Sequence, residues 1–276
     1  MDNKIYKFTD IIILESLKDK EESTGKKLEV FLKNKFEGKI QITYYDINTK
    51  EELYNLFEKM INKSSNGFFP IIHFEIHGHI SNMGFILKSN ELVNWQYLYI
   101  YCKELNFNLN NNLFLTLASC RGAHLMRKVQ PFDRCPWGFI LGSFKDLWSD
   151  EIFRDFSKFY KILLDKKDIE LAYQALCKIN PNADFEIIDS EQTFLKISKY
   201  FEERLKLEKV EKTQGKIMLD AFLRSSTFEK TKQLLNINFN TKILTPEDMI
   251  NYFSENYILA TKSMTSDFKR FFYFWK

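Results

Sequence analysis

Two short motifs bring together residue types that can carry out nucleophilic chemistry. The sequence IHGH at 76–79 ends one apolar run, and SCRG at 119–122 follows another. A cysteine paired with an imidazole suits thiol catalysis, because the base raises the fraction of the reactive thiolate. The glycine in each motif lets a substrate approach the backbone closely and leaves N–H groups to receive a developing oxyanion. We therefore expect His77 and Cys120 to form a catalytic pair.

The elements expected around these motifs follow an α/β pattern. Short apolar runs rich in β-branched or aromatic residues predict strands at 10–14, 40–45, 70–76, 113–118, 138–141 and 185–188. Amphipathic segments predict helices at 25–36, 50–62, 92–105, 150–164 and 169–179. This alternation predicts a three-layer α/β/α fold with a mostly parallel sheet. Because ligands collect at the carboxyl ends of such strands, His77 and Cys120 should emerge at one edge if their strands are parallel neighbours.

Local signals add two helix starts and a hairpin. Thr49 and Ser149 precede amphipathic segments and are candidate N-caps. The segment 84–90 combines a short apolar run with a polar turn, which indicates a hairpin or a loop excursion.

The histidines and acids at 73–79 also invite a metal interpretation. On a strand, His73 and His77 share a face but lie roughly 13 Å apart, at about 3.3 Å per residue, so they cannot bind one ion. We expect His73 to be a hydrogen-bonded core residue and His124 to belong to a helix after Cys120. An alternative is a metal-dependent hydrolase that uses His77, His79 and a remote carboxylate. The preferred interpretation needs no metal and no cofactor.

The side chain that the site accepts is left open by the sequence. Glu75, Asp146 and Asp150 are the acids near the motifs, and a pocket built from them would suit a basic substrate residue. An apolar pocket would suit a Leu-like residue instead. Asp150 is also explained as the opening residue of its helix. Arg121 has two interpretations, a contact with a substrate carboxylate or a solvated helix-start position.

The two motifs resemble those of the caspase-like cysteine peptidase superfamily, which includes caspases, metacaspases, separase and bacterial CHAT-domain proteases. Cys120 lies 43 residues after His77 and is followed by Arg121-Gly122, as in a family signature with its histidine about 50 residues upstream. The sequence departs from that signature at Ala118 and Ser119, where caspases have Gln and Ala. Metacaspases have Asp in the place of Ala118.

The segment WGFILGSFKDLWSDEIFRDFSKFYKILL at 137–164 resembles the CHAT pattern. That pattern has a strand ending in Gly-Ser, a loop with Trp, and an Asp that opens a helix. The resemblance covers about 10–188 and implies a caspase-like sheet with Cys120 as the nucleophile. It also implies His77 as base and proton donor, and the backbone N–H groups of Gly78 and Cys120 as the oxyanion hole.

The resemblance further implies a peptidase that cleaves a protein substrate through an acyl-enzyme. Bacterial members imply a role in defence or programmed death, with activity held back until a protein partner or ligand binds. A different class of function is a non-catalytic caspase-like scaffold that acts through the aromatic C-terminal segment.

Composition narrows the remaining classes. A formal net charge of +3 on 276 residues, without a clean basic cluster, gives no reason to expect nucleic-acid binding. No run of about 18 apolar residues indicates a membrane span, and the N-terminus lacks a secretory pattern. The 4 cysteines form no CxxC pair, which predicts reduced thiols and a cytoplasmic location.

The chain changes character near residue 190. We expect 1–190 to form the peptidase domain and 191–276 to form a helical C-terminal extension that regulates it or binds a partner. The segment 194–210 is charged and periodic, and Thr245 is a fitting helix cap. The aromatic run 268–276 should dock on the protein or meet a partner.

Overall fold

The computed structural model describes residues 8–64, 67–128 and 135–190. The segments predicted to form the extension (194–210, the helix opening at Thr245, and the aromatic run 268–276) lie outside the described residues. The boundary between 190 and 191 therefore stays a prediction.

A mixed, mostly parallel sheet forms the centre of the described fold, with strand order β2-β1-β3-β6-β7-β8. These strands are β1 (Asp10–Ser16), β2 (Gln41–Asp46), β3 (Pro70–Gly78), β6 (Phe114–Leu117), β7 (Phe139–Ser143) and β8 (Phe185–Asp189). Along this order all pairs are parallel except β7 with β8, which places an antiparallel strand at one edge. The prediction of a mostly parallel sheet is confirmed.

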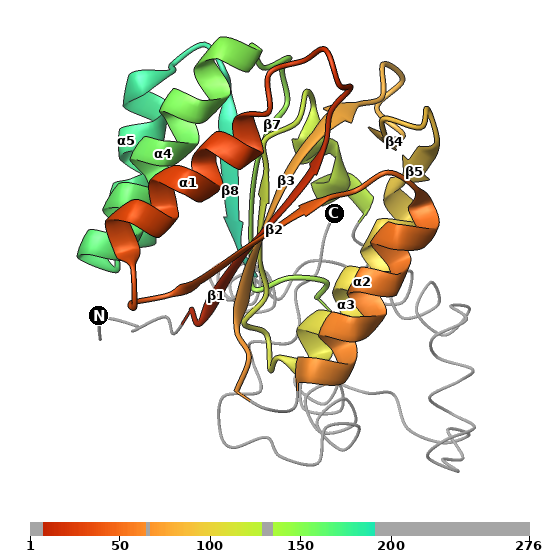
Figure 1. The fold of residues 1–276 in the computed structure, drawn as a ribbon, viewed down its shortest axis with the longest axis horizontal. Coiled ribbons are helices and arrows are strands. Elements are labelled where there is room, and N and C mark those ends of the chain that lie inside the picture. The colour runs from red at the N-terminus through yellow and green to blue at the C-terminus, as the bar shows by residue number, and fades with distance from the viewer. Residues whose placement is uncertain (1–7, 65–66, 129–134, 191–276) are drawn as a thin grey trace, which may run out of the picture. The chain divides into compact units, whose positions relative to one another are not determined.

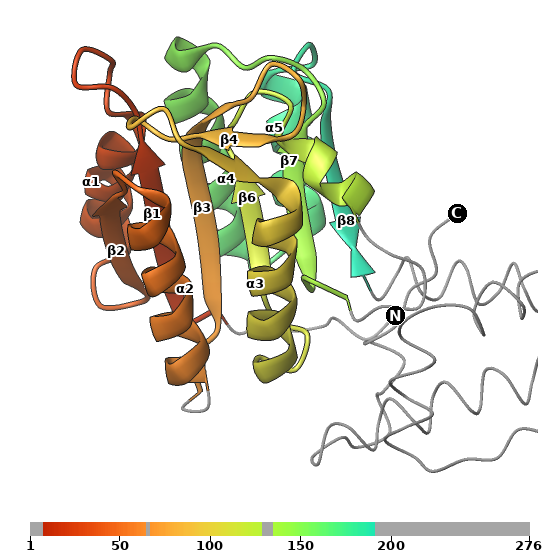
Figure 2. The same ribbon diagram turned by 90° about the vertical axis from the view of Figure 1, so that its right-hand side faces the viewer.

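Helices cover both faces of this sheet (Figure 1). On one face lie α1 (Thr24–Phe36), α4 (Ser149–Lys166) and α5 (Ile169–Ile179), and on the other lie α2 (Lys50–Lys63) and α3 (Trp95–Asn108). The view in Figure 2 shows the strands side by side with α2 and α3 in front of them. The layers are therefore α/β/α, and a 3-10 helix, η2 (Gly122–Lys128), follows the cysteine motif.

Three of the predicted helix starts differ from the structure, and the first is α1, which begins one residue early at Thr24. Thr49 caps α2 as predicted, in a capping box with Glu52. Helix α4 begins one residue earlier than expected, with Trp148 instead of Ser149 in the N-cap position. The segment predicted as helix from residue 92 first forms β5 (Leu92–Asn94), because it pairs with β4 (Gly84–Ile86) in an antiparallel ribbon beyond the end of β3.

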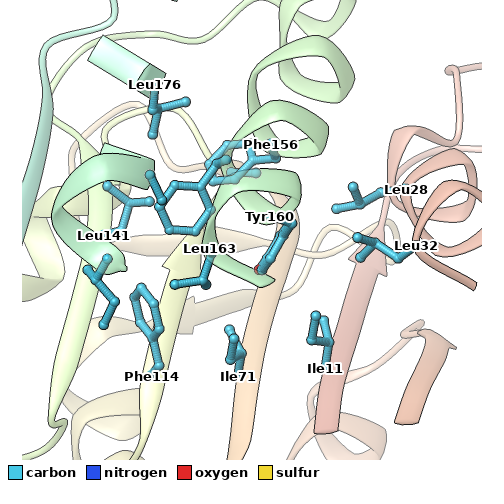
Figure 3. Packing of buried hydrophobic residues seen from close by; sticks show 14 of the residues in the cluster. Ile11, Leu28, Leu32, Ile71, Phe114, Leu141, Phe156, Tyr160, Leu163 and Leu176 are labelled. Carbon is cyan, nitrogen blue, oxygen red and sulfur yellow. The ribbon is translucent and has the colours of Figure 1, made fainter. Parts of the chain in front are cut away.

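The core under α1, α4 and α5 fixes the central strands in place (Figure 3). Strands and helices contribute fully or nearly fully buried side chains, and each large one stabilises the fold by roughly 1.5–3 kcal/mol. Those labelled in Figure 3 are Ile11, Leu28, Leu32, Ile71, Phe114, Leu141, Phe156, Tyr160, Leu163 and Leu176. Strands β3 and β6 lie in the middle of the sheet and are paired with a strand on both sides, so the residues at their carboxyl ends follow well-anchored strands.

Candidate active site

The strands that carry the two motifs are parallel neighbours. Ile71–Phe74 of β3 pair in register with Phe114–Leu117 of β6. His77 lies at the carboxyl end of β3, and Cys120 follows the carboxyl end of β6 by three residues. The structure thus confirms the expectation that both motifs emerge at the same edge of the sheet.

Gly78 brings the histidine motif into contact with Cys120. A Cβ atom built on Gly78 would lie 1.8 Å from the carbonyl oxygen of Cys120 and 3.3 Å from its Cβ. Any other residue at position 78 would overlap the Cys120 backbone, so the close approach of the two strand ends requires glycine. The residue next to His77 therefore lies directly against the predicted nucleophile.

The sulfur of Cys120 lies against the backbone of the loop between β7 and α4. The N–H of Leu147 donates to Cys120 Sγ at 3.3 Å, and the Leu147 carbonyl oxygen lies 3.6 Å from the same atom. Cys120 is partly exposed, whereas Cys102 is buried. Burial raises the pKa of the Cys102 thiol. Burial also raises the pKa of the Cys177 thiol, although a hydrogen bond with Tyr173 lowers that pKa in part. Those two cysteines are poor nucleophiles at neutral pH.

His77 has an acidic partner that sequence reasoning missed. Its Nε2 lies 2.9 Å from Oε2 of Glu21, a residue of the loop between β1 and α1. The N–H of Lys18 donates to the same oxygen at 2.7 Å. Burial raises the pKa of Glu21, but the hydrogen bonds with His77 and Lys18 together lower it more, so its net pKa lies below the ordinary value. Among the residues that the structure describes, Nδ1 of His77 has no hydrogen-bond partner.

Backbone N–H groups at this edge differ in their availability. The N–H of His79 donates to the Gly84 carbonyl oxygen at 2.8 Å, so the next pair, Gly78 with Phe85, is a non-hydrogen-bonded pair of the ribbon. The Gly78 N–H consequently points to the edge of β3 that faces β6. The N–H of Arg121 is taken by the Lys145 carbonyl oxygen at 2.9 Å.

The N–H of Cys120 has no acceptor among the residues that the structure describes. The N–H groups of Gly78 and Cys120 are the two groups that the family resemblance implies for the oxyanion hole.

Arg121 joins two loops around the cysteine. Its Nη1 donates to the Ile80 carbonyl oxygen at 2.9 Å, and its Nε lies 2.9 Å from Oδ1 of Asp146. Asp146 is therefore in a salt bridge with Arg121. The backbone of Arg121 adopts φ of +57°, an uncommon value for a residue with a side chain. Strained backbone of this kind concentrates at functional sites.

Glu75 lies below the site and not on its surface. It is 1% exposed, and its oxygens bond His73 Nε2 at 3.1 Å and the Thr24 hydroxyl. This burial corrects the expectation that Glu75 contacts substrate, because both of its oxygens already have partners inside the protein. The prediction for His73 is confirmed, since it is 0% exposed and its Nδ1 lies 2.8 Å from the Thr116 hydroxyl.

A second buried carboxylate stands beside Glu75 and was not foreseen. Glu15 is its register partner on β1 and is 3% exposed. It accepts hydrogen bonds from the Gly25 N–H at 2.7 Å, the Tyr44 hydroxyl at 2.6 Å and the Ser23 hydroxyl. These donors offset the cost of removing the carboxylate from water.

The remaining predicted residues lie apart from this network. Asp150 is exposed in the first turn of α4. His124 lies in η2, where burial and the nearby charges of Arg127 and Arg121 lower its pKa. His79 accepts a hydrogen bond through Nδ1 from the Ser81 N–H at 3.2 Å. No group of three or more potential metal ligands comes together in the described ranges.

No family model matches this chain, and no curated protein matches it. Among the helices that the structure describes, none combines the length and the hydropathy needed to cross a membrane.

Proposed function

We propose that the chain is a caspase-like cysteine peptidase of the CHAT type, with Cys120 as nucleophile and His77 as base. The observation that carries this proposal is the contact between Gly78 and the Cys120 backbone, which holds the two motifs together at the carboxyl edge of a parallel sheet. Ligand sites of open α/β sheets collect at this edge.

The reaction follows from the groups available. His77 takes the proton of Cys120, and the sulfur bonds to the scissile carbonyl carbon. The N–H groups of Gly78 and Cys120 receive the resulting oxyanion. His77 then gives its proton to the leaving amine as the C–N bond breaks, and water hydrolyses the thioester that remains. Glu21 holds Nε2 of the imidazole, so that Nδ1 exchanges the proton with the sulfur.

The cellular role in this proposal is partner-controlled cleavage of a protein substrate. Its support is the resemblance of the two motifs and of 137–164 to bacterial CHAT-domain proteases, which suggests defence or programmed death. A protein partner or ligand would raise a basal activity of the chain by ordering the loops around Cys120.

Hydrolysis of protein substrates by the full chain tests the proposal. Cys120→Ala and His77→Ala should each remove hydrolysis of unfolded casein and of a mixed peptide pool. Cys177→Ala is the matched control, because Cys177 is also a partly exposed thiol, and it should keep full activity. Hydrolysis that survives both changes in the pair would contradict the proposal.

A thiol-directed reagent separates the peptidase from the non-catalytic scaffold. If iodoacetamide modifies Cys120 no faster than Cys177, the scaffold becomes the better interpretation.

A further inference from the structure

The two most exposed large hydrophobic side chains among the described residues border the same site. Ile80 is 81% exposed and Trp148 is 73% exposed. Ile80 lies between β3 and β4, three residues after His77, and Trp148 follows Leu147, whose N–H donates to Cys120 Sγ. Single exposed apolar residues are common on protein surfaces. The informative feature is that both side chains lie on loops that contact Cys120 or the residue after it.

The Arg121 side chain connects these two loops. It donates to the Ile80 carbonyl oxygen at 2.9 Å and binds both carboxylate oxygens of Asp146, at 2.9 and 3.1 Å. Asp146 lies two residues before Trp148. A guanidinium that binds a carboxylate through two nitrogens has a defined orientation. Arg121 therefore fixes the loop of Ile80 and the loop of Trp148 on the residue that follows Cys120.

Three acids near the two motifs already have partners within the protein. Asp146 pairs with Arg121, Glu21 pairs with His77, and Glu75 is buried among protein donors. A pocket that selects a charged side chain needs an opposite charge that is free to meet it. These three acids already have partners inside the protein, whereas Ile80 and Trp148 are exposed on the loops that adjoin the Cys120 motif.

We propose that Ile80 and Trp148 form the substrate-recognition surface and select a large apolar side chain next to the scissile bond. This inference rests on the proposed function and names its substrate class: polypeptides with a residue such as Leu or Phe before the cut bond. An indole ring offers a large rigid apolar surface for such a side chain. Arg121 acts as a positioning residue that holds the surface.

Peptidyl ketones with a carboxylate leaving group test the selection. Acetyl-Ala-Ala-Ala-X acyloxymethyl ketones, with X as Leu, Phe, Lys or Asp, are added to the full chain, and mass spectrometry follows alkylation of Cys120. The Leu and Phe reagents should react at least about 10-fold faster than the Lys and Asp reagents, as expected when an apolar pocket contributes to recognition. Equal rates, or faster reaction with Lys or Asp, would overturn the inference.

Matched variants locate the recognition surface. Ile80→Ala and Trp148→Ala should each slow the Leu and Phe reagents by about 5-fold or more. Ile100→Ala and Tyr97→Ala remove side chains that are 48% and 59% exposed on α3, and they should leave these rates unchanged. Rates that do not fall in the first two variants would place recognition elsewhere.

Iodoacetamide and peptide amides distinguish this inference from the proposed function. If iodoacetamide labels Cys120 selectively but the ketones do not discriminate, the apolar surface is wrong and the reactive pair stands. If the Leu and Phe ketones react preferentially while the matching peptide amides are not hydrolysed, the surface stands and the peptidase proposal is wrong. If no reagent prefers Cys120 over Cys177, both are wrong.

Discussion

The carboxylate of Glu21 lies 2.9 Å from Nε2 of His77, across 56 residues of sequence. This contact holds the imidazole through Nε2, and it leaves Nδ1 for the proton exchange with Cys120 that we propose. It also joins the loop after β1 to the end of β3, so that three strand ends contribute to one site.

Glu21→Gln should weaken catalysis while leaving the fold intact. Glutamine keeps a hydrogen-bond acceptor for His77 but removes the negative charge, so we expect kcat to fall by about 10-fold or more, with KM changing little. Steady-state hydrolysis of an apolar peptide amide measures kcat and KM separately. An unchanged kcat would show that Glu21 has no positioning role.

Glu21→Gln should also change how the stability of the fold depends on pH. The pKa of Glu21 lies below its ordinary value of 4.5 because hydrogen bonds from His77 and Lys18 outweigh the effect of burial. A lowered pKa in the folded state adds stability above the unfolded value and loses it as pH falls through the lowered value. The difference in unfolding temperature between wild type and Glu21→Gln should therefore disappear below that range. At higher pH the difference in unfolding temperature should be small, because the pair of Glu21 and His77 is exposed.

Gly78→Ala should separate the two motifs. The new methyl group would overlap the Cys120 carbonyl oxygen, and a displacement of about 1 Å at a reacting group can cost about 100-fold in rate. Gly138→Ala is the matched control, since its methyl group would meet the Asn111 carbonyl oxygen at 2.4 Å, at the opposite end of the sheet. Both variants should lose stability, but only Gly78→Ala should slow Cys120 alkylation. An equal loss of rate in both variants would assign the effect to general destabilisation.

Arg121→Gly should loosen the recognition loops without straining the backbone. Glycine accepts the positive φ at this position, but it removes the guanidinium that binds Asp146 and the Ile80 carbonyl oxygen. Reaction with the Leu ketone should fall by about 10-fold, while alkylation by iodoacetamide changes less than about 2-fold. A similar fall with both reagents would mean that Arg121 acts on the cysteine itself.

Asp155 gives a test of the fold that is independent of catalysis. Burial raises the pKa of this carboxyl group, although hydrogen bonds from Asn180 and Arg154 lower it in part. A raised pKa in the folded state adds stability below the unfolded value of about 3.8 and loses it as pH rises through the folded value. Asp155→Asn removes this titration, so its unfolding temperature relative to wild type should rise between pH 4 and pH 7. A relative fall would show that the Arg154 ion pair dominates instead.

The sequence was sufficient to predict most of the sheet and the meeting of the two motifs. Runs such as DIIIL and LFLTLA contain few residues that suit any element other than a buried strand. Parallel neighbours bring their carboxyl ends to one edge, and the pairing of β3 with β6 does this for His77 and Cys120. The short strand β5 (Leu92–Asn94) was missed because three residues next to a helix are too few to show a period of their own.

The partners of the charged residues could not be predicted from local pattern. The loop after β1 contains several acids and lysines, and only the folded arrangement selects Glu21 for His77. Glu75 looked like a site residue because it lies between two histidines. Its burial depends on Thr24 from α1, which is 51 residues away in sequence. A polar residue on a strand shows its role only when the elements that cover it are known.

The rate of Cys120 alkylation by iodoacetamide, in wild type and in His77→Ala, tests the catalytic pair most directly. Cys177 in the same sample serves as the internal reference, and peptide mass spectrometry reads both sites. We expect Cys120 to react at least about 10-fold faster than Cys177 in wild type, and to lose that advantage in His77→Ala. Equal rates at the two cysteines in wild type, or a Cys120 rate that is indifferent to His77, would contradict the proposed pair.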